Sequence, residues 1–274
     1  MIPVIKIEDY NYDLPDGRIA KYPLPERDSS KLLLYKDGIV DSHVFKDLPL
    51  LLPEDSLMIF NDTKVVPARL RFQRESGARV EIFCLEPVDP AEYNIAFAST
   101  SRCVWKCVIG NSKRWKDDLL HYDCPADSAL STMNLTARLV SRDSQTGIVE
   151  FNWTGGEAFS KVLEECGQVP IPPYLNRETE PIDIERYQTL YAHVRGSVAA
   201  PTAGLHCTQE ILEAIGAKGI ETQNVCLHVG AGTFLPVKSS NVSEHPMHRE
   251  PFSVSLDLLR KLRAAGRPYI AVGP

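Results

Sequence analysis

Two histidines lie in turns that are built largely from small residues. His206 belongs to residues 197–208 (SVAAPTAGLHCT). His228 belongs to residues 227–234 (LHVGAGTF). An imidazole titrates near neutral pH, so it can donate or accept a proton in a reaction, and the glycines nearby let main chain approach a ligand closely. The sequence therefore predicts either one shared catalytic site or two core histidines, each held by a main-chain carbonyl.

A polar turn of another kind follows an apolar strand. Residues 57–60 (LMIF) lead directly into Asn61, Asp62 and Thr63. The Asp62 carboxylate either accepts hydrogen bonds from the N–H groups of its own turn or faces a ligand. In the second case we expect a ligand cleft, because the turn lies where the two predicted domains meet.

Metal binding is a further chemistry that histidines allow. His245 and His248 stand three residues apart in HPMH. Pro246 restrains the main chain between them, and no HExxH-type pattern occurs. We therefore expect no metal site, with a metal-dependent hydrolase that uses the histidines as an alternative function.

Strands and helices alternate around the two histidine turns. Residues 197–200 (SVAA) are expected to end a strand, and Thr208 to cap a helix whose free N–H groups face the turn. This order predicts an α/β layer with a mainly parallel sheet, whose strand ends hold ligands. The expected elements are helices at residues 157–166, 209–218 and 256–266 and strands at residues 223–229 and 269–272.

Residues 68–153 show a different pattern, with short strands separated by turn residues. In residues 79–85 (RVEIFCL), apolar and charged side chains alternate as on a half-buried strand. Many short strands without a convincing helix predict a small barrel or sandwich. We expect an α/β main domain, formed by residues 1–66 and 156–274, with an inserted small β-barrel domain at residues 67–155.

The composition is typical of a soluble globular protein, with 43% hydrophobic and 24% charged residues. No apolar run reaches the roughly 18 residues that a membrane helix needs, and no signal-peptide pattern occurs at the N-terminus. We expect a cytoplasmic monomer without membrane association. The net charge of −6 argues against nonspecific coating of nucleic acid. The seven cysteines lack a CxxC pair and are expected to be reduced thiols.

One local stretch is basic despite the acidic chain. Residues 102–116 (RCVWKCVIGNSKRWK) carry cations and two tryptophans but no acid. Cations for phosphates and indoles for unstacked bases are typical of RNA recognition. A solvated strand pair with core tryptophans has the same pattern. The candidate RNA contacts are Arg102, Lys106, Lys113, Arg114, Trp115 and Lys116.

Six phrases of the chain are long enough to compare with known families. They are DYNYDLPDGRIAKYPLPERDSSKLLLY, FNDTKVVPARL, ERYQTLYA, GSVAAPTAGLHCT, LHVGAGTFLPV and EHPMH. In their order and approximate separations they resemble those of S-adenosylmethionine:tRNA ribosyltransferase-isomerases, the queuosine biosynthesis enzymes. The resemblance runs from Asp9 to Gly273, nearly the whole chain. It implies an α/β domain with a β-barrel insert, in agreement with the patterns above.

The resemblance also implies a reaction. Members of the family transfer and isomerise the ribosyl part of S-adenosylmethionine onto 7-aminomethyl-7-deazaguanine at the tRNA wobble position. The products are epoxyqueuosine, adenine and methionine, and no methyl group moves. The partners implied are tRNA and S-adenosylmethionine, and the alternative is a shortened relative that keeps tRNA or nucleoside recognition without turnover.

This reaction requires proton transfers. The sulfonium acidifies the adjacent ribose methylene, so a base can remove a proton, and the resulting ylide can open the ribose and expel adenine. His206 and His228 are the candidate bases, and the sequence does not decide between them. Asp62, Asp28 or the second histidine is expected to protonate the leaving adenine.

Binding of S-adenosylmethionine requires groups of both charges. The methionine carboxylate needs a cation or a helix N-terminus, for which Arg27, Arg69 and the helix capped by Thr208 are candidates. Carboxylates or aromatic faces are expected near the sulfonium and the ammonium. The expected contacts are Arg27, Asp28, Asn61, Thr63, Arg69, Thr202, Gly204, Thr208, Gly230, Gly232 and Thr233.

The chain departs from the family pattern at three places. Cys207 stands where relatives usually carry phenylalanine, and Leu235 stands where many carry arginine. Relatives also continue beyond the strand at residues 270–273 (IAVG) with a Thr-Thr-Ser-Val-Arg-like segment. Because a parallel strand without its following helix leaves apolar surface uncovered, we expect either a shortened form or a partner on that face.

Overall fold

A computed structural model describes residues 4–110, 115, 118–123, 133–143, 146–234, 237, 239–245, 247, 249–264 and 266–273, without the side chains of residues 231 and 233. The chain divides into two compact units, which are named here for their sheets. The α/β unit comprises Met1–Asp62, Ile171–Ala192 and Ala200–Pro274, and the barrel unit comprises Thr63–Pro170 and His193–Ala199. The domain boundaries given by the sequence stay a prediction.

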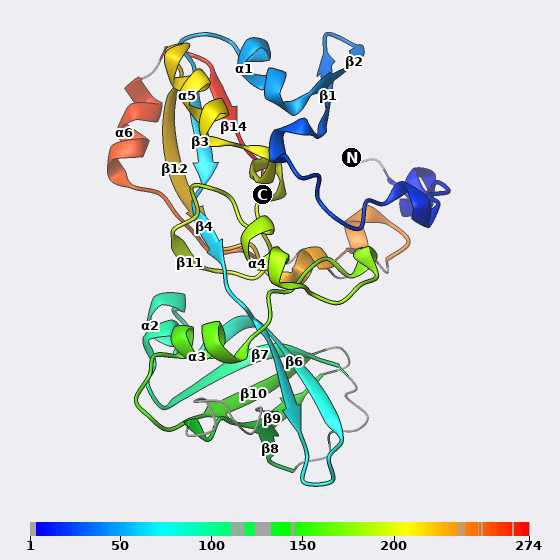
Figure 1. The fold of residues 1–274 in the computed structure, drawn as a ribbon, viewed down its shortest axis with the longest axis vertical. Helices are drawn as coiled ribbons and strands as arrows, with labels where there is room; N and C mark the ends of the chain where they lie inside the picture. The colour runs from blue at the N-terminus through cyan, green and yellow to red at the C-terminus, as the bar shows by residue number, and fades with distance from the viewer. Residues whose placement is uncertain are drawn as a thin grey trace. The chain divides into compact units, whose positions relative to one another are not determined.

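The α/β unit contains a four-stranded sheet with the order β13-β12-β3-β14 (Figure 1). Strand β3 lies between β12 and β14 and runs parallel to both, while β13 pairs antiparallel with β12. The mainly parallel sheet expected from the sequence is confirmed. Its strands are β3 (Leu57–Asn61), β12 (Glu221–Leu227), β13 (Phe252–Ser253) and β14 (Tyr269–Ala271).

Helix α5 (Gln209–Ala217) forms where the sequence predicts it. Thr208 Oγ1 accepts the N–H of Ile211 at 3.4 Å and caps the first turn. The apolar stripe of α5 packs onto β3 and onto Phe45, which lies before β3 in the chain. This packing holds the turn that precedes α5 against the sheet. The buried cluster consists of Phe45, Met58, Phe60, Cys207, Ile211, Ile215 and Ile220.

The remaining regular elements of this unit are shorter. A hairpin near the N-terminus pairs β1 with β2 in a separate two-stranded sheet. Glu221, the first residue of β12, accepts hydrogen bonds from Lys261 of α6 and from Arg267, which fasten α6 beside β12 (Figure 1). These elements are β1 (Lys31–Lys36), β2 (Ile39–Val44), α1 (Leu48–Leu51), α4 (Pro181–Arg186) and α6 (Leu256–Ala264).

The barrel unit contains a closed barrel of six antiparallel strands with the order β10-β7-β6-β5-β8-β9. Closure leaves no unpaired edge, so the short strands seen in the sequence can be stable. The predicted insert is therefore a barrel. The strands are β5 (Arg69–Gln73), β6 (Arg79–Asp89), β7 (Arg102–Gly110), β8 (Leu120–Tyr122), β9 (Thr136–Arg142) and β10 (Thr146–Asn152).

Two helices belong to the barrel unit. Helix α2 (Tyr93–Ala98) was not expected, because its six residues are too few to show a helical period. Helix α3 (Phe159–Cys166) is the predicted helix at residues 157–166, but it packs on the barrel. The Phe159 ring lies 5.6 Å from that of Trp105 and 5.3 Å from that of Trp153, between ring centroids. These aromatic contacts explain why α3 joins the barrel unit.

The strand before the His206 turn differs from expectation. Strand β11 (Val194–Ser197) pairs in parallel with β4 (Thr63–Val65) and forms no part of the four-stranded sheet. Periodicity shows that a strand is present but not which strand it pairs with, so the sequence assigned β11 to the main sheet.

The structure also bears on membrane-spanning helices and on the state of the cysteines. Within the described residues, no helix is long and apolar enough to cross a membrane. The six described cysteines are buried free thiols, as expected, and Cys124 lies outside the described residues. The free thiols are Cys84, Cys103, Cys107, Cys166, Cys207 and Cys226.

Candidate functional site

His206 ends a short 3₁₀ helix, Thr202–His206, in the α/β unit. Its Nδ1 lies 3.2 Å from the main-chain oxygen of Arg27, and its ring centroid lies 5.2 Å from that of Phe45. The imidazole is only half-buried. A hydrogen bond at one nitrogen and an aromatic neighbour together fix the orientation of the ring.

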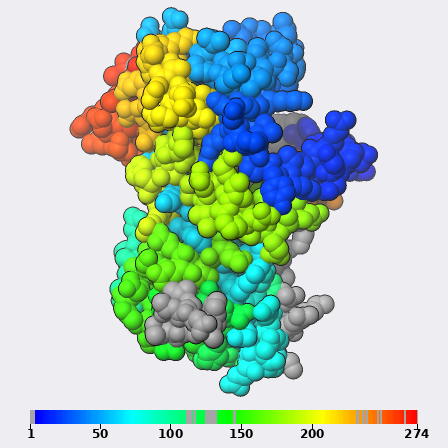
Figure 2. Space-filling view, in the orientation of Figure 1, coloured from blue at the N-terminus to red at the C-terminus, as the bar shows by residue number. Residues whose placement is uncertain are grey.

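Arg27 holds the same turn with its side chain. Nη1 donates to the main-chain oxygens of Gln188 and Leu205 at 2.8 and 3.0 Å, and Nη2 donates to that of Glu185 at 2.7 Å. Burial lowers the pKa of Arg27. In Figure 2 the blue N-terminal residues lie against yellow-green residues further along the chain, as these bonds require. Arg27 thus acts as a clamp, and its predicted contact with a methionine carboxylate stays a prediction.

The small residues before His206 are explained in part by close packing. Gly204 is buried, and a Cβ placed on it would lie 1.8 Å from the Tyr191 hydroxyl oxygen. The Tyr191 ring in turn lies 4.5 Å from that of Phe60. Close approach by another segment is therefore the reason for glycine at this position. Thr202 is exposed, and Asp28 follows Arg27 in a half-buried turn.

The turn that carries His228 is built on the end of β12. Asn61, at the end of β3, donates from Nδ2 to the Leu227 oxygen at 2.8 Å and accepts the Leu227 N–H at 2.9 Å. The side-chain amide thereby copies a main-chain pair and extends the sheet by one step. The main-chain N–H of Asp62 donates to Val225 at 3.0 Å. Asn61 and Asp62 therefore position the residues that precede His228.

His228 is half-buried, as His206 is, but it has different neighbours. Burial lowers the pKa of His228, and its Nε2 lies 3.6 Å from the Sγ atom of Cys226. Its main-chain N–H donates to the oxygen of Pro251 at 3.0 Å. Within the described residues, His206 makes no hydrogen bond or ring contact with His228. The structure thus gives the two predicted bases different environments.

Sequence reasoning missed Glu250. The Gly230 N–H donates to Glu250 Oε1 at 3.0 Å, which draws a carboxylate to the turn after His228. The signal available was a lone acid in a loop, which is too common to be informative. Gly232 lies in the 3₁₀ helix Ala231–Phe234, and the side chain of Thr233 is outside the described residues.

Two predicted ligands of S-adenosylmethionine fall in the barrel unit and have protein partners there. Arg69 Nη2 donates to both carboxylate oxygens of Glu81, at 2.8 and 2.9 Å. Thr63 Oγ1 donates to the Val194 oxygen at 3.4 Å. A ligand carboxylate at Arg69 would have to compete with Glu81.

The basic stretch in the barrel unit also has internal partners. Arg102 donates to Asp89 and Glu150, and Lys106 donates to Glu86 at 2.7 Å. Trp115 is 2% exposed, and its Nε1 donates to the Asp118 oxygen. We therefore assign the Trp115 indole to the barrel core, because a buried ring offers no face to a base, and this corrects its predicted stacking role. The predicted contacts outside the described residues are Lys113, Arg114 and Lys116.

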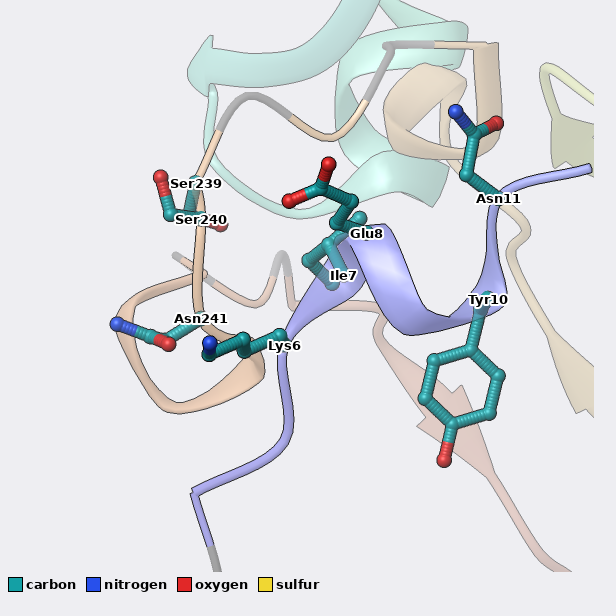
Figure 3. A pocket seen from close by; sticks show the side chains of 8 residues that line it. All are labelled: Lys6, Ile7, Glu8, Tyr10, Asn11, Ser239, Ser240 and Asn241. Atoms are coloured by element: carbon teal, nitrogen blue, oxygen red, sulfur yellow. The ribbon is translucent and has the colours of Figure 1, made fainter.

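A cavity of about 630 Å³ in the α/β unit contains none of the predicted site residues (Figure 3). It lies where the main chain of residues 5–7 is hydrogen-bonded to that of residues 240–242. No group of three His, Cys, Asp or Glu side chains in the described part of the chain is placed to hold a metal ion. The cavity is lined by Lys6, Ile7, Glu8, Tyr10, Asn11, Ser239, Ser240 and Asn241.

The model of one protein family, described as queuosine biosynthesis protein, matches residues 7–274 of the chain. The chain belongs to this queuosine biosynthesis family. It is 41% identical over 273 residues to the S-adenosylmethionine:tRNA ribosyltransferase-isomerase of Trichlorobacter lovleyi, covering 97% of this chain and 74% of the relative. The enzyme of the same name from Desulfitobacterium hafniense is 38% identical over 282 residues, covering 98% and 74%.

The chain also matches a solved structure of a protein with a similar name. The crystal structure of an S-adenosylmethionine tRNA ribosyltransferase from Thermotoga maritima is 24% identical, covers 96% of this chain and 68% of that chain, and gives a TM-score of 0.37. In this queuosine biosynthesis protein, Cys207 occupies a buried position beside Phe45 and Met58, and burial raises the pKa of its thiol to about 11.

Proposed function

We propose that this chain catalyses the reaction for which its relatives are named, the transfer and isomerisation of the ribosyl part of S-adenosylmethionine onto tRNA. The acceptor base is 7-aminomethyl-7-deazaguanine at the wobble position, and the products are epoxyqueuosine, adenine and methionine. The observation that carries the proposal is the 41% identity over 97% of the chain to an enzyme of that name. No observation favours the non-catalytic alternative.

The chemistry begins at the sulfonium. Its positive charge acidifies the neighbouring ribose methylene, a base takes one proton, and the electron pair left on carbon forms a ylide that opens the ribose and expels adenine. His206 and His228 both lie in the α/β unit and are the proposed bases, since an imidazole nitrogen can accept a proton. Asp28 and Asp62 are proposed as the acids that help adenine to leave.

S-adenosylmethionine is proposed to bind the α/β unit. The N-terminus of α5, with Arg27 close by, supports this placement because both are suited to a carboxylate. Further proposed contacts are the loop residues Thr202, Gly230 and Gly232. tRNA is proposed to contact cations of the barrel unit, where Lys106 is 41% exposed despite its bond to Glu86. We further propose a cytoplasmic monomer that needs no metal.

The test is a reconstituted reaction. The purified chain is incubated with S-adenosylmethionine and tRNA that carries 7-aminomethyl-7-deazaguanine, and adenine release and nucleoside mass are followed. Adenine in equal amount to a nucleoside of the epoxyqueuosine mass is the expected result. The control tRNA carries guanine at the wobble position and should give no product. No product from the chain, while the Trichlorobacter lovleyi enzyme is active in parallel, would overturn the proposal.

A further inference from the structure

One residue holds the Leu205–His206 peptide from two sides. The guanidinium of Arg27 donates to the Leu205 oxygen at 3.0 Å, and the main-chain oxygen of Arg27 lies 3.2 Å from His206 Nδ1. The side chain of Arg27 is fixed in turn by the oxygens of Glu185 and Gln188. The position of the imidazole is therefore coupled to the position of Arg27 by two separate hydrogen bonds.

The contact at Nδ1 also fixes where the proton of the ring resides. A main-chain carbonyl has no hydrogen to give, so in this contact Nδ1 must carry the hydrogen and donate it. In the neutral imidazole the other nitrogen, Nε2, then holds the lone pair. Nε2 makes no hydrogen bond within the described residues and is not among their buried unbonded polar atoms. The lone pair of His206 Nε2 is therefore available to accept a proton.

His228 lacks this arrangement. Its Nε2 lies 3.6 Å from the Sγ atom of Cys226. A base must reach the substrate with an unoccupied lone pair. At His206 the tautomer is fixed and Nε2 makes no hydrogen bond within the described residues, whereas the same nitrogen of His228 already contacts Cys226 Sγ.

We propose that Arg27 is a positioning residue that holds His206 as the Nδ1–H tautomer, so that Nε2 acts as the base in the proposed reaction. This inference rests on the proposed function. In the step, the C–H bond of the methylene beside the sulfonium breaks, the proton forms an N–H bond at Nε2, and the electron pair stays on carbon next to the positive sulfur. The imidazole becomes an imidazolium, which the Arg27 carbonyl stabilises at Nδ1.

The experiment combines a spectroscopic and a kinetic measurement on the full chain. Long-range ¹H–¹⁵N correlation of the imidazoles identifies the tautomer of each neutral histidine, and H206Q assigns the His206 signals. Wild type should show His206 as Nδ1–H. In R27K one ammonium replaces the guanidinium fork, so the clamp on three carbonyls is lost. R27K should therefore shift His206 toward the Nε2–H form and lower kcat by about tenfold or more, with the KM for S-adenosylmethionine changed less.

The matched control is R186K. Arg186 also binds main-chain oxygens, those of Leu24 and Pro25, but makes no hydrogen bond to the His206 turn within the described residues. R186K should keep the Nδ1–H tautomer and a kcat within about twofold of wild type. The inference is overturned if R186K and R27K have the same effects, or if wild-type His206 is Nε2–H while the chain is active. Nδ1–H imidazole in a wild-type chain that releases no adenine would overturn the proposed function, and with it the catalytic use of Nε2.

Discussion

Arginines serve different partners in two regions of the molecule. In the barrel wall, strands β5 to β10, Arg69 pairs with Glu81 and Arg102 with Glu150. In the loop layer of the α/β unit, defined as residues 15–30, 171–192 and 200–206, guanidinium groups donate to main-chain oxygens. Strands satisfy their own main chain and leave arginines to pair across the sheet, whereas loops have carbonyls that need donors. The loop-layer arginines that make these bonds are Arg27, Arg177 and Arg186.

The two kinds of arginine contact differ in how easily they can open. Cross-strand ion pairs on a barrel wall can open toward solvent or toward a phosphate at small cost. Guanidinium groups that close a loop layer cannot be removed without releasing the carbonyls they hold. Changes in the loop layer should therefore cost more stability than equivalent changes in the barrel wall, and among the loop-layer arginines Arg27 is the one bonded to the His206 turn within the described residues.

The largest effect is expected for Asp183. This carboxylate is 3% exposed and accepts two bonds from Arg177, at 2.8 and 2.7 Å. Removing one partner leaves a buried charge without its counter-ion, so D183A should lower the free energy of unfolding of the α/β unit by about 3 kcal/mol or more. The measurement is hydrogen exchange of the α/β unit combined with denaturant titration.

The matched change in the barrel wall is E150Q. Glu150 accepts from Arg102 and Arg138, whose side chains are 48% and 60% exposed and can turn to water. We expect a loss of about 1 kcal/mol. All three tryptophans, at positions 105, 115 and 153, lie in the barrel unit, so tryptophan fluorescence reports on that unit. Equal losses in D183A and E150Q would break the comparison between the regions.

Glycines offer a test of intermediate size. A methyl at Gly204 would meet the Tyr191 hydroxyl at 1.8 Å, and a methyl at Gly167 in the barrel unit would meet the Pro67 carbonyl oxygen at 1.8 Å. G204A should cost about 1–3 kcal/mol and be partly relieved by Y191F, because that change removes the clashing oxygen. G167A meets main chain, so no side-chain change should relieve it. Denaturant titration of single and double variants measures the difference, and a G204A loss unchanged by Y191F would contradict it.

A smaller effect should appear with pH. Burial lowers the pKa of His228 below its usual value, so the unfolded chain binds the proton more readily than the folded one. The stabilising contribution is complete above pH 6.5 and is lost as the pH falls through the folded pKa. The α/β unit should lose stability as the pH falls below 6.5, and H228Q should flatten that dependence.

The barrel unit should respond only in stronger acid. Burial tends to raise the pKa of Glu150, but hydrogen bonds from Arg138, Asn152 and Arg102 together hold it below 4.5. Its contribution is present above pH 4.5 and is lost below it. Hydrogen exchange in the α/β unit and tryptophan fluorescence in the barrel unit should therefore give different pH profiles, and identical profiles would contradict this assignment.

The smallest effect is expected on tRNA binding. Lys106 is already bonded to Glu86, so a phosphate contact requires that pair to open. K106A should weaken tRNA binding by about threefold or less and make the slope of log K against log salt slightly shallower. Fluorescence anisotropy at several salt concentrations measures both quantities. E86Q, which frees the lysine, is the matched control and should strengthen binding.

Much of the fold could be predicted because its signals are local. The cap at Thr208, the stripe of α5 and the alternation in β6 each depend on neighbours along the chain. Partner choice is not local, so the sequence assigned β11 to the wrong sheet. It also placed α3 with the α/β part, although the Phe159 ring packs among barrel aromatics.

The candidate site could be predicted only as a set of residues. The sequence identified His206, His228 and Asn61 as unusual, since their turns are rich in small and polar residues. It gave no sign that Glu250 would reach the Gly230 N–H, because twenty residues separate them and one acid in a loop has no pattern.

The sequence by itself determined the family, the alternation of helices and strands, and the two histidine turns, because each is written in residues that lie close together along the chain. Only the tertiary structure decided that the Arg27 guanidinium donates to the Leu205 oxygen and that the Arg27 main-chain oxygen contacts His206. It also decided that Trp115 is a core residue. The physical reason is the same in both cases: a guanidinium or an indole takes its role from the carbonyls and apolar surface that folding brings to it from distant parts of the chain.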